Sequence, residues 1–150
     1  MTAMDRGATA KRRSASLYDE VFGAGHLEAA DALMAPDIVS HPPGLPDRIG
    51  PDGLKQQAAS LRAAIPDLTV EHLDQLGEGD RVVSRWRATG HHTGPLRLPA
   101  GELPPTGAAI DFTEIRIDRH ADGRIVESWW IPDRFTIWQQ LGLLPPTGPG

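Results

Sequence analysis

The stretch that decides the fold is IDFTEIRIDRHADGRIVESWWIPD, residues 110–133. Ile110–Arg119 and Ile125–Ile131 are rich in branched and aromatic side chains, which favour strands. Between them, Ala121-Asp122-Gly123 is typical of a tight turn. This stretch therefore predicts a hairpin of two antiparallel strands.

A second hairpin is expected just upstream. Leu68–Leu76 and Arg81–Gly90 have strand composition and are joined by the turn Gly77-Glu78-Gly79-Asp80. A Pro- and Gly-rich loop over Thr93–Gly107 leads from this hairpin to the next, and a short early strand is expected at Ile38–His41. Most of the strands therefore lie in the second half of the chain.

The first half has helical periodicity instead. Ala15–Phe22 and Leu27–Met34 are amphipathic, and a third helix begins after Gly50-Pro51-Asp52-Gly53 and ends at Pro66. Phe135–Leu141 is expected to form a last short helix. Helices followed by hairpin-linked strands indicate the α+β class, in which three to four helices pack on a curved antiparallel sheet. We expect this sheet to curl into a cone and enclose a hydrophobic pocket.

Length and composition limit the other possibilities. The chain has 150 residues, of which 39% are hydrophobic, so we expect one domain over 14–143 with a flexible N-terminal tail at 1–13 and a C-terminal tail at 144–150. Without an apolar run of membrane-spanning length or a signal-like start, the expected protein is cytoplasmic and binds no membrane. The absence of cysteine excludes disulfides and a cysteine nucleophile, and a net charge of −5 argues against nucleic acid as a partner.

Several short motifs follow one another in a specific order. They are Gly79-Asp80-Arg81-Val82-Val83-Ser84-Arg85-Trp86, Gly90-His91-His92-Thr93-Gly94, Pro104-Pro105-Thr106-Gly107, Asp122-Gly123-Arg124-Ile125-Val126-Glu127, and Trp129 four residues before Asp133. With His41, Gly50–Gly53, Ile65–Leu68 and Gln139–Gly142, they resemble the SnoaL-like (ester cyclase) branch of the nuclear transport factor 2-like superfamily. The resemblance covers about Ser14–Gly142.

This resemblance implies a conical barrel with a hydrophobic cavity, often dimeric through its sheet. The founding members of the family close the last ring of aromatic polyketides by intramolecular aldol condensation, without a metal or a cofactor, and use one Asp as acid and base. Asp133 matches that residue. The expected ligand is therefore a small hydrophobic molecule, and the expected partner is a second copy of the chain.

Two interpretations of Asp133 are open. As acid and base, it needs a pKa raised toward neutrality by an apolar surround, which Trp129, Trp130, Ile131 and Phe135 would supply. Alternatively, it caps the helix that follows it. Because strand side chains alternate, an inward Asp133 would bring Trp129 into the pocket, although a place in the core is an alternative for either tryptophan.

Histidines are the next candidates, because an imidazole can hydrogen-bond an enolate oxygen or share the proton transfer near neutral pH. His41 and His92 match positions that face the pocket in the resembled family, whereas His91 would then point away. The alternative for His41 is a strand end before the Pro42-Pro43 turn. A metal site built from these histidines lacks a suitably spaced carboxylate, so no metal is expected.

The central strands offer further polar side chains. Trp86 is expected to point inward, with Arg85 and Arg87 outward and paired with acids; the alternative is an inward arginine that binds a substrate carboxylate or phenolate. Glu114 becomes a second pocket carboxylate if the register of its hairpin brings it and Arg116 to the face of Asp133.

Three functions remain in competition. The first is a SnoaL-like polyketide cyclase that performs a cofactor-free aldol ring closure, or a related isomerisation, with Asp133 as acid and base and His41 or His92 polarising the carbonyl. Its substrate would contact Trp86, Trp129, Glu114, Ile131 and Phe135. The second is a non-catalytic ligand-binding or dimerisation module, for which an Asp133 bonded only to helix amides would be a mark. The third is a hydroxylase or an epoxide-hydrolase-like enzyme, which would need a second pocket carboxylate such as Glu114 or a reductase partner.

Overall fold

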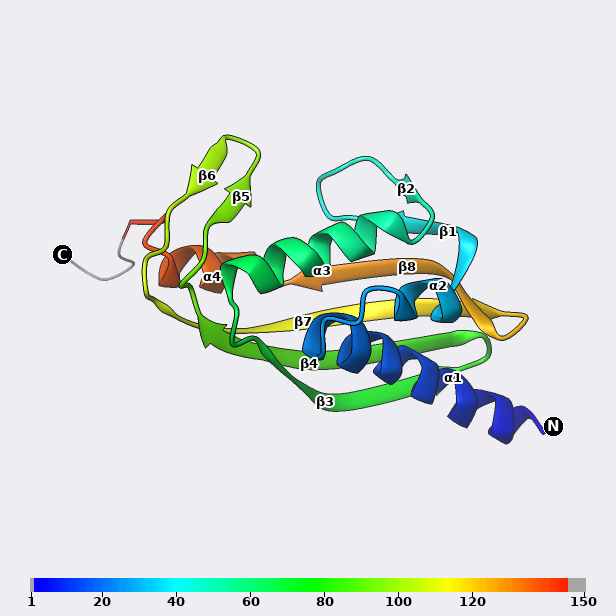
Figure 1. Cartoon of the computed structure of the whole chain (residues 1–150). Helices are drawn as coiled ribbons and strands as arrows, with labels where there is room; N and C mark the ends of the chain where they lie inside the picture. Colours follow the sequence, from blue (N-terminus) through cyan, green and yellow to red (C-terminus); the bar gives the residue numbers. More distant parts are fainter. Residues whose placement is uncertain (1, 146–150) are drawn as a thin grey trace.

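Helices cover one face of a curved six-stranded sheet in the computed structural model, which describes residues 2–145 (Figure 1). The helical elements are α1 (Ala3–Leu17), the π-helix η1 (Tyr18–Gly23), α2 (Ala29–Leu33), α3 (Asp52–Ala64) and α4 (Arg134–Gln140). The strands are β1 (Met34–His41), β2 (Arg48–Ile49), β3 (Thr69–Glu78), β4 (Arg81–His91), β5 (Leu96–Leu98), β6 (Gly101–Leu103), β7 (Ala109–Ala121) and β8 (Arg124–Pro132). The fold is α+β, as the sequence predicts.

The large sheet has the strand order β2-β1-β8-β7-β4-β3. Both predicted hairpins, β3–β4 and β7–β8, are present and antiparallel. The sheet departs from the expected antiparallel pattern at one place, because β1 runs parallel to β8. This pairing is possible because a long connection, which contains α3 and several strands of the same sheet, separates β1 from β8, as parallel neighbours require.

Residues 3–13, which belong to the segment expected as a flexible tail, are helical. A capping box starts this helix: the Thr2 hydroxyl accepts from the Asp5 N–H, and the Asp5 carboxylate accepts from the Thr2 N–H. At its other end, α1 buries Ser14 and Leu17. The domain boundaries at 14 and 143 stay predictions.

Two local predictions are corrected. The helix expected to run through Met34 ends at Leu33, and Met34 already belongs to β1. Pro36 lies inside this strand where its register with β8 shifts, and a bulge tolerates the missing N–H of proline. The loop over 93–107 is also more regular than expected, since it contains the small β5–β6 hairpin.

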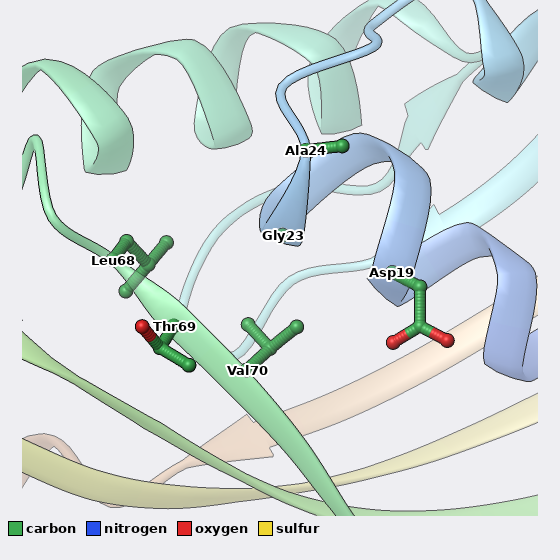
Figure 2. Close-up of a pocket in the computed structure, with 6 residues that line it drawn as sticks. All are labelled: Asp19, Gly23, Ala24, Leu68, Thr69 and Val70. Atoms are coloured by element: carbon green, nitrogen blue, oxygen red, sulfur yellow. The ribbon is translucent and has the colours of Figure 1, made fainter.

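The π-helix η1 begins directly where α1 ends and faces the first part of β3. Figure 2 shows the pocket between them, with a volume of about 350 Å³, lined by Asp19, Gly23, Ala24, Leu68, Thr69 and Val70. A Cβ at Gly23 would come within 3.0 Å of the Val70 side chain, so a small residue allows this close approach. Of the lining residues, Asp19 alone is ionisable.

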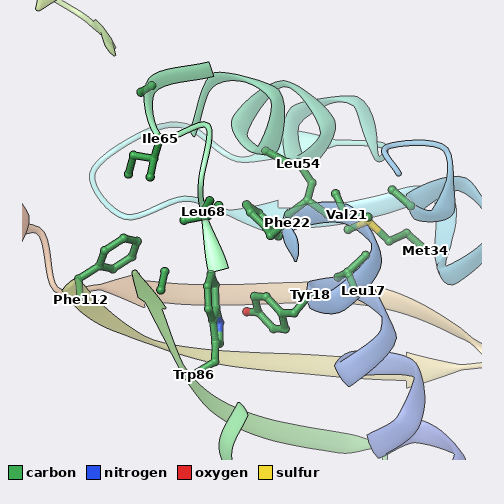
Figure 3. Packing of buried hydrophobic residues seen from close by; sticks show 14 of the residues in the cluster. Leu17, Tyr18, Val21, Phe22, Met34, Leu54, Ile65, Leu68, Trp86 and Phe112 are labelled. Atoms are coloured by element: carbon green, nitrogen blue, oxygen red, sulfur yellow. The ribbon is translucent and has the colours of Figure 1, made fainter. Parts of the chain in front are cut away.

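The space between the helices and the sheet is filled by a hydrophobic core (Figure 3). Trp86 of β4, only 1% exposed, lies at its centre, with its ring centroid 4.2 Å from that of Tyr18 and 5.7 Å from that of Phe22. The predicted inward orientation of Trp86 is confirmed. Burial of each of these large aromatic side chains contributes on the order of 2 kcal/mol to the stability of the fold. The contact of Trp86 with Tyr18 and Phe22 therefore stabilises the packing of η1 on the sheet. None of the helices among residues 2–145 combines the length and the apolar character that crossing a bilayer requires.

Candidate functional site

Strand β7 places a row of ionisable side chains inside the fold. Its even-numbered residues point inward, and among them Glu114, Arg116, Asp118 and His120 are each 8% exposed or less. They share one face because successive side chains of a β-strand point to opposite faces of the sheet. Buried ionisable groups are rare unless they are paired, so each of these side chains needs an explanation.

Arg116, Asp118 and His120 form a polar network, which extends to Arg13 of α1 through a contact of 2.8 Å with His120 Nδ1. Asp118 accepts from the Arg116 guanidinium at 2.6 Å, from Ser128 at 2.7 Å and from Ser14 of α1 at 2.8 Å. Ser14 also contacts His120 at 3.1 Å. Burial lowers the pKa of His120, so its ring is neutral at neutral pH. These groups satisfy one another, and they join α1 to β7 and β8.

Glu114 differs from its neighbours because it lacks a close ionic partner. Its carboxyl is 5% exposed, and its hydrogen bond from the Tyr18 hydroxyl is long, at 3.4 Å. Burial raises the pKa of Glu114 to about 7, although the charges of Arg116 and Arg134 and the bond from Tyr18 oppose the shift. Burial also raises the pKa of Tyr18, which keeps its hydroxyl a donor. Near neutral pH, Glu114 can therefore both accept and release a proton.

A second pocket has a volume of about 300 Å³, and Glu114 is not one of the residues that line it. Two of its lining residues connect it to Glu114. Trp130 stands opposite Arg116 across the β7–β8 pair, with the guanidinium carbon 5.6 Å from its ring centroid, and the charge of Arg134 acts on the pKa of Glu114. The whole lining consists of Pro42, Leu45, Arg48, Gln56, Gln57, Ser60, Trp130 and Arg134. We therefore take this pocket, which we call the Trp130 pocket, as the candidate site.

Asp133 does not line the Trp130 pocket, where an acid–base role would need it. It is exposed at the N-terminus of α4, where its carboxylate accepts from the Thr136 N–H at 3.0 Å and from the Thr136 hydroxyl at 2.7 Å. These bonds lower the pKa of Asp133, so the expected upward shift is wrong. The expected apolar surround is also missing, because Ile131 is 71% and Phe135 is 55% exposed. The alternative of a helix cap is confirmed by this geometry, while a catalytic role for Asp133 stays a prediction.

His41 and Trp129, both expected in the pocket, lie on the outer face of the sheet. His41 contacts Asp47 through Nδ1 and Glu127 through Nε2, each at 2.8 Å, and its ring stacks on Trp129. Trp129 and Ile131 share one side of β8, and that side faces away from the core, whereas Asp133 lies beyond the end of this strand.

A bulge in β8 explains this reversal. The register with β7 shifts between Arg119 and His120, which leaves one extra residue, Val126, on β8. Ile125 is buried before the shift, and Ser128 and Trp130 are buried after it, so the inward side changes from odd to even numbers. One inserted residue turns every later side chain of the strand to the opposite face.

His92 is fully buried at the end of β4 and lines neither pocket described above. Its Nδ1 accepts from the Thr106 N–H at 3.2 Å, while its Nε2 has no hydrogen-bond partner within residues 2–145. Nowhere in the described part of the chain do three or more His, Asp or Glu side chains gather as a metal site would need. The outward ion pairs expected for Arg85 and Arg87 are confirmed, with Asp74 and Asp111 as their partners.

Sequence reasoning missed most of the groups around Glu114. Glu114, Arg116 and Asp118 recur at every second position of one strand, and this spacing of charged residues could have indicated an inward polar row. No local signal pointed to Tyr18, Arg48 or Arg134, because distant parts of the chain bring them to the site.

Comparisons with known proteins agree on one family. The family model of the SnoaL-like polyketide cyclases matches residues 12–141. Among solved structures, IdmH from Streptomyces antibioticus, a proposed polyketide cyclase, is 34% identical with a TM-score of 0.74, over 89% of this chain and 98% of IdmH. A proposed SnoaL-like polyketide cyclase from Jannaschia sp. CCS1 is 26% identical with a TM-score of 0.80, over 93% of this chain and 95% of its own.

More distant similarity extends to other activities. AclR from Streptomyces galilaeus, a proposed hydroxylase, is 24% identical with a TM-score of 0.79, over 93% of this chain and 99% of its own, which shows a shared fold. A search of the curated proteins found no match. The family match over most of the chain, the 34% identical structure and the α+β fold with its curved sheet lead to the same assignment. The chain belongs to the SnoaL-like polyketide cyclase family.

Proposed function

We propose that this protein closes a ring in a bulky polyketide-type ketone by a cofactor-free intramolecular aldol reaction, or a related isomerisation, with Glu114 as acid and base. The observation that carries this proposal is the buried Glu114 carboxyl, with a pKa of about 7, on the strand that pairs with β8, which carries Trp130 of the pocket. General acid–base catalysis is most effective when the pKa of the group lies near the working pH. Asp133, with its lowered pKa, is less suited to the task.

The reaction needs three steps of proton and bond chemistry. The Glu114 carboxylate removes a proton from a carbon flanked by two carbonyls. The Tyr18 hydroxyl, which donates to Glu114 in the free protein, shifts its hydrogen bond to the resulting enolate oxygen. The enolate carbon then forms a bond with a second carbonyl of the same molecule. Protonated Glu114 returns the proton to the new alkoxide, so the product is an isomer of the substrate.

The surroundings of Glu114 support this assignment. The indole of Trp130 offers an apolar wall for a planar ring system, while the guanidinium of Arg116 is held by Asp118 and Ser128. Because Asp118 is already paired with Arg116, it does not compete for the substrate proton. Within residues 2–145, the Asp133 carboxylate accepts hydrogen bonds only from Thr136 of the helix that follows it, which is the feature expected of a non-catalytic module. In our proposal, Glu114 supplies the acid–base group that such a module would lack.

A direct test compares wild type, Glu114→Gln and Asp133→Asn on an anthraquinone that carries both a β-keto ester side chain and a ring carboxylate. The readout is chromatographic formation of a ring-closed isomer of unchanged mass. We expect closure by wild type and Asp133→Asn, and a loss of about 100-fold or more for a folded Glu114→Gln. Loss in Asp133→Asn with an active Glu114→Gln would make Asp133 the base instead. No closure by wild type would reject the aldol proposal and favour a binding module, whereas equal closure by all three would reject both carboxylates.

We also propose that two copies associate through the outer face of the sheet. Ile115 and Ile131 are direct cross-strand partners there, and they are 48% and 71% exposed. The nearby charges are already neutralised within the chain, since Arg85 pairs with Asp74 and Arg87 with Asp111. An apolar centre with internally paired charges is self-complementary, as a two-fold interface requires.

A further inference from the structure

We infer that the Trp130 pocket binds a substrate carboxylate between Arg48 and Arg134, so that the substrate is an aromatic ketone bearing an acid group. This inference rests on the proposed function, because it concerns the substrate of the same site. It begins from the charges of the pocket. Arg48 and Arg134 both line it, and neither has an acidic partner within 4.0 Å in the described residues.

The acids nearest to these arginines in the sequence are occupied elsewhere. Asp47 contacts His41, and Asp133 accepts both of its hydrogen bonds from Thr136. By contrast, Arg85 and Arg87 on the outer face are paired with carboxylates. In a chain of net charge −5, two cationic groups left without acids at one concave site attract an anion.

Both side chains are supported in place. The Arg134 guanidinium donates to the Pro43 carbonyl at 3.2 Å. The Arg48 side chain lies against the start of α3, where a Cβ at residue 53 would come within 2.8 Å of the Arg48 Cδ. Glycine at position 53 therefore leaves the room that Arg48 occupies. A guanidinium held in this way loses less entropy on binding a carboxylate and can form two parallel hydrogen bonds with it.

The remaining lining suits an aromatic acid. Trp130, Leu45 and Pro42 provide apolar contact area for a planar ring. Gln56, Gln57 and Ser60 of α3 provide neutral donors and acceptors for further oxygens of the ligand. A volume of about 300 Å³ lies at the lower end of small-molecule sites.

Arg134 also links binding to the proposed chemistry. The charge of Arg134 lowers the pKa of Glu114, against the larger effect of burial. A bound carboxylate would neutralise Arg134 and make Glu114 a stronger base once the substrate is in place. A neutral substrate would leave this effect unchanged.

The test measures binding rather than turnover. Calorimetric titration with anthraquinone-2-carboxylate and with its neutral carboxamide gives a Kd for each, in wild type and in an Arg48→Met/Arg134→Met double variant. Arg97→Met, which removes an exposed arginine from the β5–β6 hairpin, controls for the loss of charge. We expect wild type and Arg97→Met to bind the carboxylate about 10- to 100-fold tighter than the carboxamide, and the double variant to lose this preference with its carboxamide affinity unchanged.

Three results would overturn the inference: equal Kd values for the two probes in wild type, a preference that survives in the double variant, or no binding of either probe. The binding result can be distinguished from the result of the ring-closure assay. A carboxylate preference without ring closure would leave the subsite standing and reject the aldol proposal. Ring closure by a wild type that binds the carboxylate and the carboxamide equally would support the aldol proposal and reject the carboxylate subsite.

Discussion

The imidazole of His41 stacks on the indole of Trp129 on the outer face of the sheet, with ring centroids 5.0 Å apart and planes 16° apart. The two residues are register partners on the parallel strands β1 and β8. His41 also contacts Asp47, which lies in the segment that carries Pro42 and Leu45 of the Trp130 pocket. The stack therefore anchors one wall of the candidate site from outside.

His41→Phe should loosen this wall while keeping the aromatic stack. The hydrogen bond with Glu127, and then the one with Asp47, raise the pKa of His41 above its ordinary value. A raised pKa in the fold gives a stabilisation that is complete below about pH 6.5 and is lost as the pH rises through the folded value. Amide exchange at residues 44–49 should therefore be slower at pH 6 than at pH 8 in wild type, after correction for intrinsic rates. In the variant, amide exchange at these residues should be faster, and it should be no slower at pH 6 than at pH 8. Unchanged protection in the variant would show that the segment 44–49 does not depend on the hydrogen bonds of His41.

Glu114→Gln should stabilise the protein at alkaline pH. Because burial raises the pKa of Glu114 to about 7, the wild-type fold is favoured while the carboxyl is protonated, and it loses stability as the pH rises from about 4.5 through 7. Urea unfolding measures the free energy of unfolding of both proteins at pH 5.0 and 8.5. The value for the variant minus that for wild type should increase by on the order of 3 kcal/mol from the lower pH to the higher. Glu71→Gln, on the exposed side of β3, should show no such gain. A constant difference between Glu114→Gln and wild type would mean that Glu114 titrates as an ordinary carboxyl.

Asp133→Ala should destabilise α4 by about 1 kcal/mol, because the helix loses the acceptor for the Thr136 N–H. Asp133→Asn should cost much less, since an amide oxygen can accept the same bond. The free energy of unfolding in urea at pH 7 measures both. If Asn and Ala lowered it equally, the charge of Asp133 rather than its capping bond would be the stabilising feature.

Ile131→Asp should separate the proposed dimer into single chains, because it places a charge at the apolar centre of the outer face. Light scattering after size-exclusion chromatography should report about twice the chain mass for wild type and the mass of one chain for the variant. Met4→Asp is the matched control, since Met4 is an exposed apolar residue of α1, on the other face of the sheet (Figure 1). A wild type that elutes as a single chain would reject the dimer.

Much of the fold follows from local sequence signals. The alternation on β4 and the turns at 77–80 and 121–123 predict the two hairpins, and the helical periodicity of residues 54–65 predicts α3. Trp86 and its flanking arginines are oriented as expected, because neighbouring residues on one strand must point to opposite faces. These features depend on residues within a few positions of one another.

The candidate site depends on contacts that no local pattern contains. The period of two predicts that Trp129, Ile131 and Asp133 share a face, but a bulge at Val126 determines which face it is. The pKa of Glu114 depends on burial beneath a helix whose Tyr18 is 96 residues away, and the Trp130 pocket combines β1–β2, α3, β8 and α4. The sequence by itself determined the two large hairpins, α3, α4 and the family, because these follow from short-range pattern and motif order. The tertiary structure alone decided which carboxyl is buried, because desolvation is produced by the whole packed fold.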